Sequence, residues 1–262
     1  MLNTFLKTYF QSRPLFLGLI RAKELELFHR CLPPAVSEPG YRILDFGSGD
    51  GFFSRTLLKG LGASLTAADR AEKTVVMKGA EGIDNHATRA DGASLPFKTG
   101  SFDLIISNSV LEHVEDVQHT MQELARIVKW RGTVLCSVMT ERWEEYLLGR
   151  AWLGQSYAAW LRRRQDHKHL LHAGEWRARF EQAGLLPKAV IGYMDKRASR
   201  WLELAHYLSA PALVSHRLCG RWVLFPFLFE LVPLHLLLSS LVRDDIPAAD
   251  AAALFFVLEK NP

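Results

Sequence analysis

The sequence predicts an α/β fold with a doubly wound, mostly parallel sheet, and three features indicate it. The apolar run from Ile43 to Phe46 predicts a buried strand that ends in a glycine-rich turn, and a helix follows from Phe52. Apolar strands and helical patterns then alternate through residues 40–140. At 262 residues and 48% hydrophobic content, the chain can bury a sizeable core without needing more than one domain.

The glycine turn predicts a nucleotide-type cofactor site. Gly47, Gly49 and Gly51 let a ligand approach the backbone, and the free N–H groups of a helix start favour a negative group. The dinucleotide fingerprint requires glycine three positions after Gly49, where Phe52 stands. Asp45, two residues upstream of Gly47, can hold a cationic amine. An amine, a carboxylate and a nucleoside in one ligand describe S-adenosylmethionine.

The next strands end in acids that suit the same ligand. Residues 65–70 predict a second strand ending in Asp69, whose carboxylate can accept hydrogen bonds from ribose hydroxyls. Residues 86–97 add a third strand ending in Asp91, which can accept from an adenine amino group. A fourth strand, a polar turn and a helix start follow within residues 101–117.

With LPF at residues 95–97 and LEHV at residues 111–114, the chain closely resembles the class I S-adenosylmethionine-dependent methyltransferases. The resemblance implies a Rossmann-like sheet of seven strands, with strand seven antiparallel. Trp130 and Arg131 replace the usual proline and glycine in what we expect to be a turn. Carried over residue by residue, the resemblance implies cofactor contacts from Asp45, Gly47, Ser48, Gly49, Gly51, Asp69, Arg70, Asp91, Gly92, Ser107 and Asn108.

The resemblance also divides the chain into segments. Residues 175–184 match the last helix of the family, residues 185–193 its sixth strand and residues 253–260 its closing seventh strand. We therefore expect an N-terminal helical cap (1–34), a cofactor-binding core (40–193), an apolar helical insertion between strands six and seven (194–250) and a closing strand (251–262).

Methyl transfer requires few protein groups, because the sulfonium already activates its methyl. The protein must align the acceptor and exclude water, and a base is needed only if the acceptor loses a proton. The candidate bases are His113 in the LEHV stretch and the linker histidines His167, His169 and His172. Glu24 or His29, in the helix predicted for residues 19–32, could also reach a substrate.

No metal site is predicted. Quinone-pathway relatives carry an acid three residues before the glutamate of the LEH stretch, sometimes with a metal, but Ser109 stands there, before Glu112. The three cysteines are widely separated, which indicates neither a disulfide framework nor a zinc site. With no signal peptide visible, we expect a reducing cytoplasmic location.

The insertion is the most unusual segment. Residues 222–242 hold 15 apolar residues in 21, and residues 201–214 form a second apolar segment. A single membrane span is excluded, because the strands on either side must join one sheet. Residues 200–242 therefore predict a helical hairpin in the membrane interface, with a lid over the site or a homodimer face as alternatives.

Two other segments favour contact with a membrane surface. Residues 160–169 cluster basic residues beside tryptophans, and the first ten residues resemble a short interfacial helix. The net charge is +4, but the basic residues are clustered locally and the sequence contains no recognised nucleic-acid-binding module. No nucleic-acid partner is therefore expected.

The leading functional hypothesis is methyl transfer, preferably to oxygen, on a lipid, isoprenoid or lipid-linked saccharide at the inner face of the membrane. The first alternative is methylation of a soluble metabolite, with the insertion as lid or dimer interface. The second is a scaffold that binds S-adenosylmethionine without turnover.

Overall fold

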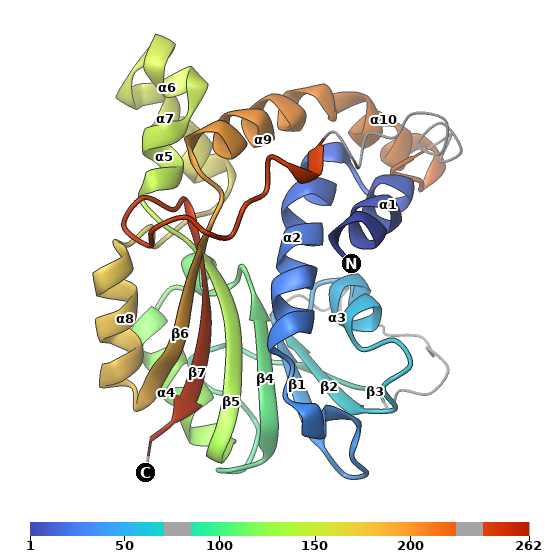
Figure 1. The fold of residues 1–262 in the computed structure, drawn as a ribbon, viewed down its shortest axis with the longest axis vertical. Helices are drawn as coiled ribbons and strands as arrows, with labels where there is room; N and C mark the ends of the chain where they lie inside the picture. Colours follow the sequence, from blue (N-terminus) through green and yellow to red (C-terminus); the bar gives the residue numbers. More distant parts are fainter. Residues whose placement is uncertain (71–84, 224–237, 262) are drawn as a thin grey trace.

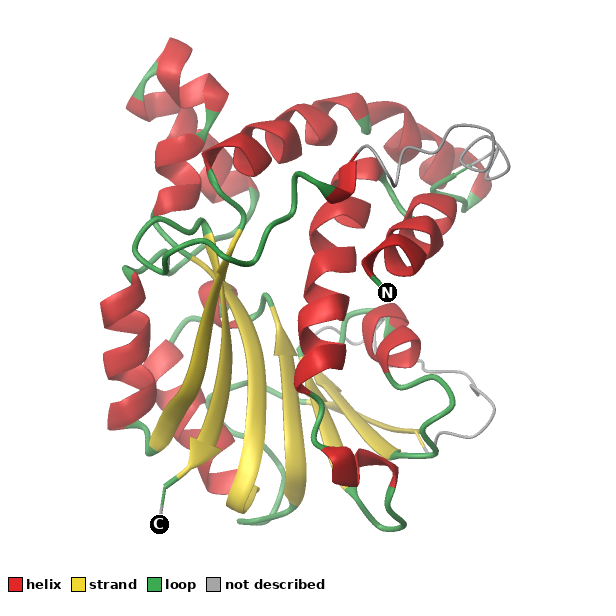
Figure 2. Ribbon diagram, viewed as in Figure 1, coloured by secondary structure: helices red, strands yellow, loops and turns green. Residues whose placement is uncertain are grey.

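The computed structural model describes residues 1–70, 85–223 and 238–261, and it contains a seven-stranded sheet with helices on both faces (Figures 1 and 2). The strands are β1 (Arg42–Phe46), β2 (Ser64–Asp69), β3 (Asn85–Arg89), β4 (Phe102–Asn108), β5 (Val128–Met139), β6 (Leu185–Tyr193) and β7 (Ala253–Lys260). Their order is β3-β2-β1-β4-β5-β7-β6. Strand β7 runs antiparallel to β5 and β6, whereas β1 to β5 pair in parallel. The predicted fold class is therefore confirmed.

Successive residues of a strand point to opposite faces of the sheet, and both faces are apolar here. Helices therefore cover each face. Ile43 packs in the core on the side of α2 and α3, whereas Leu44 packs in the core on the side of α4 and α8. The described helices are α1 (Leu2–Ser12), α2 (Leu15–Cys31), α3 (Phe52–Leu57), α4 (Val117–Ile127), α5 (Arg142–Tyr146), α6 (Leu148–Leu153), α7 (Gln155–Arg164), α8 (Ala173–Gln182), α9 (Lys196–Leu208) and α10 (Ala210–Cys219), with short 3-10 helices at Pro34–Ser37 and Leu111–His113.

The strand order reverses between β1 and β4. The chain passes from β1 outward to β2 and β3, and then returns to place β4 on the other side of β1. Asp45 of β1 therefore lies in register with Ile106 of β4. The loops after these two strands diverge at their carboxyl ends, which is where ligands bind in open α/β sheets.

Helices α9 and α10 lie between β6 and β7, where the sequence predicts the insertion. They arch over the carboxyl ends of the parallel strands, and α9 packs against the N-terminal helix α2 (Figure 1). Residues 224–237, which make up most of the apolar segment at residues 222–242, lie outside the described residues. Across the three described ranges, no helix combines the length and apolarity that a bilayer span requires.

The expected turn at Trp130 and Arg131 is wrong. Strand β5 begins at Val128, directly after α4, and includes both residues. Its pairing with β4 is irregular at this point, because Phe102 pairs with Val128 whereas Leu104 pairs with Thr133. Arg131 has φ 56°, so a bulge inside the strand replaces the expected turn.

The expected interfacial helix at the N-terminus is also wrong in part, because protein contacts cover its apolar face. Leu6, Tyr9 and Phe10 of α1 are buried. Gly18 of α2 permits the close approach, since a Cβ at this position would lie 2.5 Å from the Phe10 ring. Helix α1 thus belongs to the core under α2, and little of it remains for a membrane surface.

Candidate functional site

The glycine turn between β1 and α3 has a backbone that favours glycine at three positions. Gly47, Gly49 and Gly51 have φ of 75°, 53° and 68°, in the left-handed region that other residues adopt at a cost. The N–H of Gly47 donates to the Ala68 carbonyl over 2.8 Å, which fixes the turn against the end of β2. A Cβ on Gly47 would lie 2.3 Å from a methyl of Val110, so only glycine fits here without displacing the loop after β4.

Two cavities meet at Gly47. The first, cavity A, has a volume of about 370 Å³ and lies over the ends of β2 and β3. The second, cavity B, has a volume of about 200 Å³ and lies between the turn and the N-terminal helices. Cavity A is lined by Phe46, Gly47, Asp69, Arg70, Ala90, Asp91, Gly92, Ala93, Ser109, Val110, His113, Val114, Glu115, Asp116 and Thr120. Cavity B is lined by Tyr9, Arg13, Leu17, Arg21, Asp45, Gly47, Ser48, Gly49, Asp50, Phe52, Phe53, Asn108 and Trp222.

The predicted ribose and adenine residues all line cavity A. Asp69 is tied to the glycine turn, because one of its carboxylate oxygens accepts the N–H of Gly49 over 2.9 Å. Asp91 accepts the N–H of Ala93 over 3.0 Å in the turn after β3. A Cβ on Gly92 would lie 2.9 Å from the Thr120 hydroxyl, so glycine keeps this wall of the cavity close to α4. Arg70 completes the predicted set on this side.

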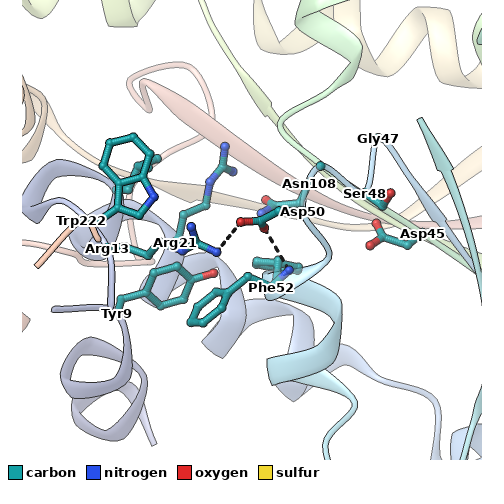
Figure 3. A pocket seen from close by; sticks show the side chains of 13 residues that line it. Tyr9, Arg13, Arg21, Asp45, Gly47, Ser48, Asp50, Phe52, Asn108 and Trp222 are labelled. Carbon is teal, nitrogen blue, oxygen red and sulfur yellow. Dashed lines mark hydrogen bonds and ion pairs between the residues drawn. The ribbon is translucent and has the colours of Figure 1, made fainter. Parts of the chain in front are cut away.

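Cavity B contains the other predicted turn residues and has an uneven lining. Figure 3 shows Tyr9 and Trp222 at one end and Asp45 and Ser48 at the other. Arg13 from the end of α1 forms an ion pair with Asp50 of the turn, which connects the N-terminal helices to the site (Figure 3). One end of the cavity therefore combines aromatic side chains with Arg13 and Arg21, and we call it the aromatic end; the other end is polar (Figure 3).

Asp45 is a buried acid beside this cavity. It accepts a hydrogen bond from the Ser54 hydroxyl over 2.5 Å, and burial raises its pKa from 3.8 to about 7. A cation that entered cavity B would favour the ionised carboxylate. Ser48 is also buried there, and its hydroxyl has no hydrogen-bond partner among the described residues. Both observations fit a ligand that carries an amine and a carboxylate.

The two predicted residues at the end of β4 differ in position. Asn108 lines cavity B, and its side-chain oxygen accepts the Ser137 hydroxyl over 2.7 Å. Ser107 is fully buried in the sheet and lines neither cavity, and its hydroxyl is unpartnered within the described part of the chain. Gly51 also lines neither cavity, because it forms the N-cap of α3.

A polar network beside the cavities was largely missed by sequence reasoning. Glu24 of α2 is fully buried and accepts hydrogen bonds from Tyr193 (2.8 Å), Ser109 (3.0 Å) and Arg21 (2.6 Å). Arg21 also donates to the Ser109 hydroxyl over 2.9 Å and lines cavity B. Ser109 has φ 52°, an unusual conformation that aims its hydroxyl at this network. The sequence suggested Glu24 but not Arg21. The one sequence signal for Arg21 is its position three residues before Glu24, which lets the two side chains meet on one face of a helix.

Glu112 lies behind this network as a second buried acid. Both of its carboxylate oxygens are buried without a hydrogen-bond partner among the described residues. Burial is the largest influence on this group and raises its pKa from 4.5 to about 8, so it is mostly protonated at neutral pH. In the described part of the chain, no group of three or more acids, histidines or cysteines could hold a metal ion.

The predicted histidine bases occupy different surroundings. His113 lines cavity A, shares a hydrogen bond with the Asp166 carbonyl over 3.0 Å, and has a pKa lowered by burial. The His167 ring lies against the His113 ring in a tilted arrangement with centroids 4.9 Å apart, and burial lowers the pKa of His167 to about 3. His169 contacts the Glu115 carbonyl over 3.2 Å, whereas His172 caps α8 and bonds to Glu141 over 2.5 Å. Neither cavity is lined by His169 or His172.

Comparison with known proteins identifies the family of this chain. A family model described as a methyltransferase domain matches residues 17–187. A ubiquinone biosynthesis O-methyltransferase from Rhizobium etli is 30% identical over 143 residues, which cover 51% of this chain and 55% of that protein. The ubiquinone biosynthesis O-methyltransferase from Bordetella avium is 29% identical over 166 residues, which cover 60% of this chain and 67% of that protein. The chain thus spans only about half the length of the first of these relatives.

Solved structures share the fold at low sequence identity. An S-adenosylmethionine-dependent methyltransferase from Mesorhizobium loti has a TM-score of 0.56 at 18% identity, covering 93% of this chain and 100% of that one. A geranyl diphosphate methyltransferase has a TM-score of 0.58 at 11% identity, and the match covers 90% of this chain and 76% of that one. The family model extends over well more than half of the chain, from α2 to β6. The protein therefore belongs to the class I S-adenosylmethionine-dependent methyltransferases.

Proposed function

We propose that this protein transfers the methyl group of S-adenosylmethionine to a hydroxyl oxygen of a hydrophobic small molecule. The observation that carries the proposal is the meeting of two unlike cavities at Gly47. Cavity A has acids suited to a nucleoside, and cavity B has a polar end and an aromatic end. A cofactor that crosses Gly47 would present its methyl to whatever occupies the aromatic end.

The linings of the two cavities support the cofactor-binding roles that we propose. Asp69 would hold the ribose, and Asp91 and Gly92 would face the adenine. Asp45 would face the amine of the methionine end. The remaining predicted contacts are Gly47, Ser48, Gly49, Gly51, Arg70, Ser107 and Asn108, of which Gly51 and Ser107 would act by shaping the turn and the strand. When bound, the sulfonium supplies a methyl group that is already activated for transfer.

The acceptor class follows from the aromatic end of cavity B. Tyr9 and Trp222 lie at that end (Figure 3), and Leu17, Phe52 and Phe53 line the same cavity. Such a lining favours an aromatic ring or an isoprenoid chain. Transfer to oxygen is supported by the similarity to the ubiquinone biosynthesis O-methyltransferases of Rhizobium etli and Bordetella avium. An acceptor hydroxyl must lose its proton as it is methylated, so a base is required.

Glu24 is the base that the contacts favour over the histidines. It already accepts the hydroxyl hydrogen of Ser109, and the Arg21 guanidinium lies against both groups. An acceptor hydroxyl beside Arg21 would pass its proton through Ser109 to Glu24, while Arg21 stabilises the developing oxyanion. His113 remains the second candidate, because it lines cavity A.

The finer proposal is that the acceptor is a lipid, an isoprenoid or a lipid-linked saccharide reached at the inner membrane face. The exposed apolar side chains of α9 and α10 support it. The same side chains also suit the alternative, in which α9 and α10 form a dimer face and the acceptor is a soluble metabolite.

Mass spectrometry tests the proposal in two steps. Lipid and polar extracts of cells that lack the gene should contain a species lighter by one methylene than its counterpart in wild-type cells. The purified protein with methyl-labelled S-adenosylmethionine should then transfer the label to this species. The proposal fails if the label reaches carbon or nitrogen only, or if the protein binds the cofactor but methylates no extract.

A further inference from the structure

Helices α9 and α10 present an outer face whose apolar side chains are exposed in the described structure, although the Tyr207 hydroxyl shares a hydrogen bond with Tyr157 of α7. On α9, Ala198, Leu202 and Ala205 are buried against the body of the protein. The opposite side of the two helices exposes large apolar side chains, up to 79% at Leu218. We call this surface the outer face of α9–α10, and it consists of Trp201, Leu204, Tyr207, Leu208, Leu213, Val214 and Leu218.

Exposed apolar side chains are concentrated on this part of the molecule. Seven of the twelve exposed large hydrophobic residues in the described chain belong to the outer face of α9–α10. Three more, Trp152, Leu153 and Trp160, lie on α6 and α7. Figure 1 shows α6, α7, α9 and α10 together beyond the carboxyl ends of the parallel strands. A patch of this kind marks an interaction surface.

The charges around the outer face are positive. Between residues 196 and 221 the cations are Lys196, Arg197, Arg200, Arg217 and Arg221. Glu203, the one acid in that range, is buried and accepts the backbone N–H groups of Leu148 and Gly149. Asp195, just before the range, caps α9 by accepting the N–H of Ala198 over 2.8 Å. Lys196, Arg197 and Arg200 line one hollow together with Trp201 and Leu204, so this part of the outer face is both apolar and cationic.

The same helices connect this surface to the site. Trp222, three residues after α10, stacks on His216 of α10 with ring centroids 3.9 Å apart. Trp222 also lines cavity B, at the end opposite Asp45 (Figure 3). The end of α10 thus borders the aromatic end of cavity B.

We propose that the outer face of α9–α10 binds the surface of an anionic lipid bilayer, with both helices parallel to the membrane plane. Amphipathic helices with large apolar residues and flanking cations bind in this way. The orientation places the aromatic end of cavity B near the headgroups, where a hydrophobic acceptor enters it. Only this last step rests on the proposed function.

A second copy of the chain is the competing occupant, and charge disfavours it. A twofold dimer would bring the same surface of both copies together. The cations of one copy would then face those of the other, with no exposed acid in α9 or α10 to oppose them. An anionic bilayer instead supplies the opposite charge to all of them.

Vesicle flotation with the full chain tests the proposal. The protein should float with vesicles of phosphatidylglycerol and phosphatidylcholine, and less with phosphatidylcholine alone. Leu204→Glu/Leu208→Glu should reduce partitioning at least tenfold. Arg197→Gln/Arg217→Gln should reduce it about thirtyfold at low salt, since each cation contributes about fivefold near an anionic surface. At high salt, Arg197→Gln/Arg217→Gln should partition onto vesicles as wild type does, because salt screens the attraction between the cations and the lipid.

Matched controls lie at the far end of the sheet. Trp130→Glu changes another exposed aromatic residue, near the start of β5, and should not alter partitioning. Lys59→Gln/Lys98→Gln removes two cations from loops that precede β2 and β4, and should have little effect. Calorimetry with S-adenosylmethionine reports whether each variant retains its folded site.

Two outcomes would overturn the proposal. One is wild-type protein that stays unbound to anionic vesicles. The other is a wild-type dimer that becomes monomeric in Leu204→Glu/Leu208→Glu, which would assign the face to a second copy. Vesicle binding without S-adenosylmethionine binding would leave the surface assignment intact and refute the proposed function alone.

Discussion

Replacing Asp45 with Asn is expected to stabilise the unliganded protein while weakening cofactor binding. Burial raises the pKa of Asp45 from 3.8 to about 7, so the folded state holds a proton that the unfolded state releases between these values. Stability therefore falls as pH rises through this window. At about 1.4 kcal/mol per pH unit, the ionised carboxylate costs about 4 kcal/mol above pH 8. Asn avoids this cost, and its advantage should grow by about 2 kcal/mol between pH 5.5 and 8.5.

Urea denaturation at these two pH values measures the stability difference, and calorimetry measures cofactor binding. Loss of the carboxylate should weaken S-adenosylmethionine binding by about 2 kcal/mol, the contribution of a charged hydrogen bond. Wild-type binding near pH 7 should release a proton and weaken at lower pH. An analogue without the α-amine should bind wild type and Asp45→Asn equally well.

Glu112→Gln is the matched control for this experiment. It removes another fully buried acid of raised pKa, one that lines neither cavity. It should stabilise the protein at high pH and leave cofactor affinity unchanged. The reasoning would be refuted if Asp45→Asn kept the wild-type pH dependence of stability, or if both variants bound the cofactor as wild type does.

Three further substitutions test other parts of the site. Gly47→Ala should destabilise the protein by about 1–3 kcal/mol and abolish cofactor binding, because the new Cβ would meet Val110. Gly40→Ala is the control: Gly40 also has a positive φ, of 82°, but no atom of the described residues lies near its Cβ position, so only the backbone strain should lower the stability of this variant. Thermal unfolding measures both variants. Asp69→Ala should weaken S-adenosylmethionine binding by about 2–4 kcal/mol in calorimetry; unchanged affinity would remove Asp69 from the ribose. Glu24→Gln should lower kcat by about 10² to 10⁴ with cofactor affinity unchanged, and an unaffected kcat would favour His113.

The sheet and the cofactor half of the site were predictable because their signals are local. The turn after β1 requires glycines within five residues, and Asp69 and Asp91 follow strands whose ends meet at one edge of the sheet. The network around Glu24 was not predictable, since its partner Tyr193 is 169 residues away and only tertiary packing brings them together. Burial of α1 also depends on tertiary packing, because Phe10 meets Gly18 only when α1 folds back against α2.

The irregular strand β5 shows a different limit of sequence reasoning. Trp130 and Arg131 occupy positions where the family pattern predicts a turn, and local propensity allows either structure. The pairing of Val128 with Phe102 extends the strand through them, and that pairing depends on β4. The histidine candidates do not converge on one place, because His169 bonds to the Glu115 carbonyl and His172 to Glu141, and neither histidine lines a cavity.

Calorimetric titration of the full chain with S-adenosylmethionine, alongside a nicotinamide dinucleotide, tests the central claim most directly. The claim is that one cofactor lies across Gly47, with its nucleoside in cavity A and its methionine end in cavity B. We predict binding of one S-adenosylmethionine per chain and no binding of the dinucleotide. Binding of the dinucleotide without S-adenosylmethionine would contradict the account.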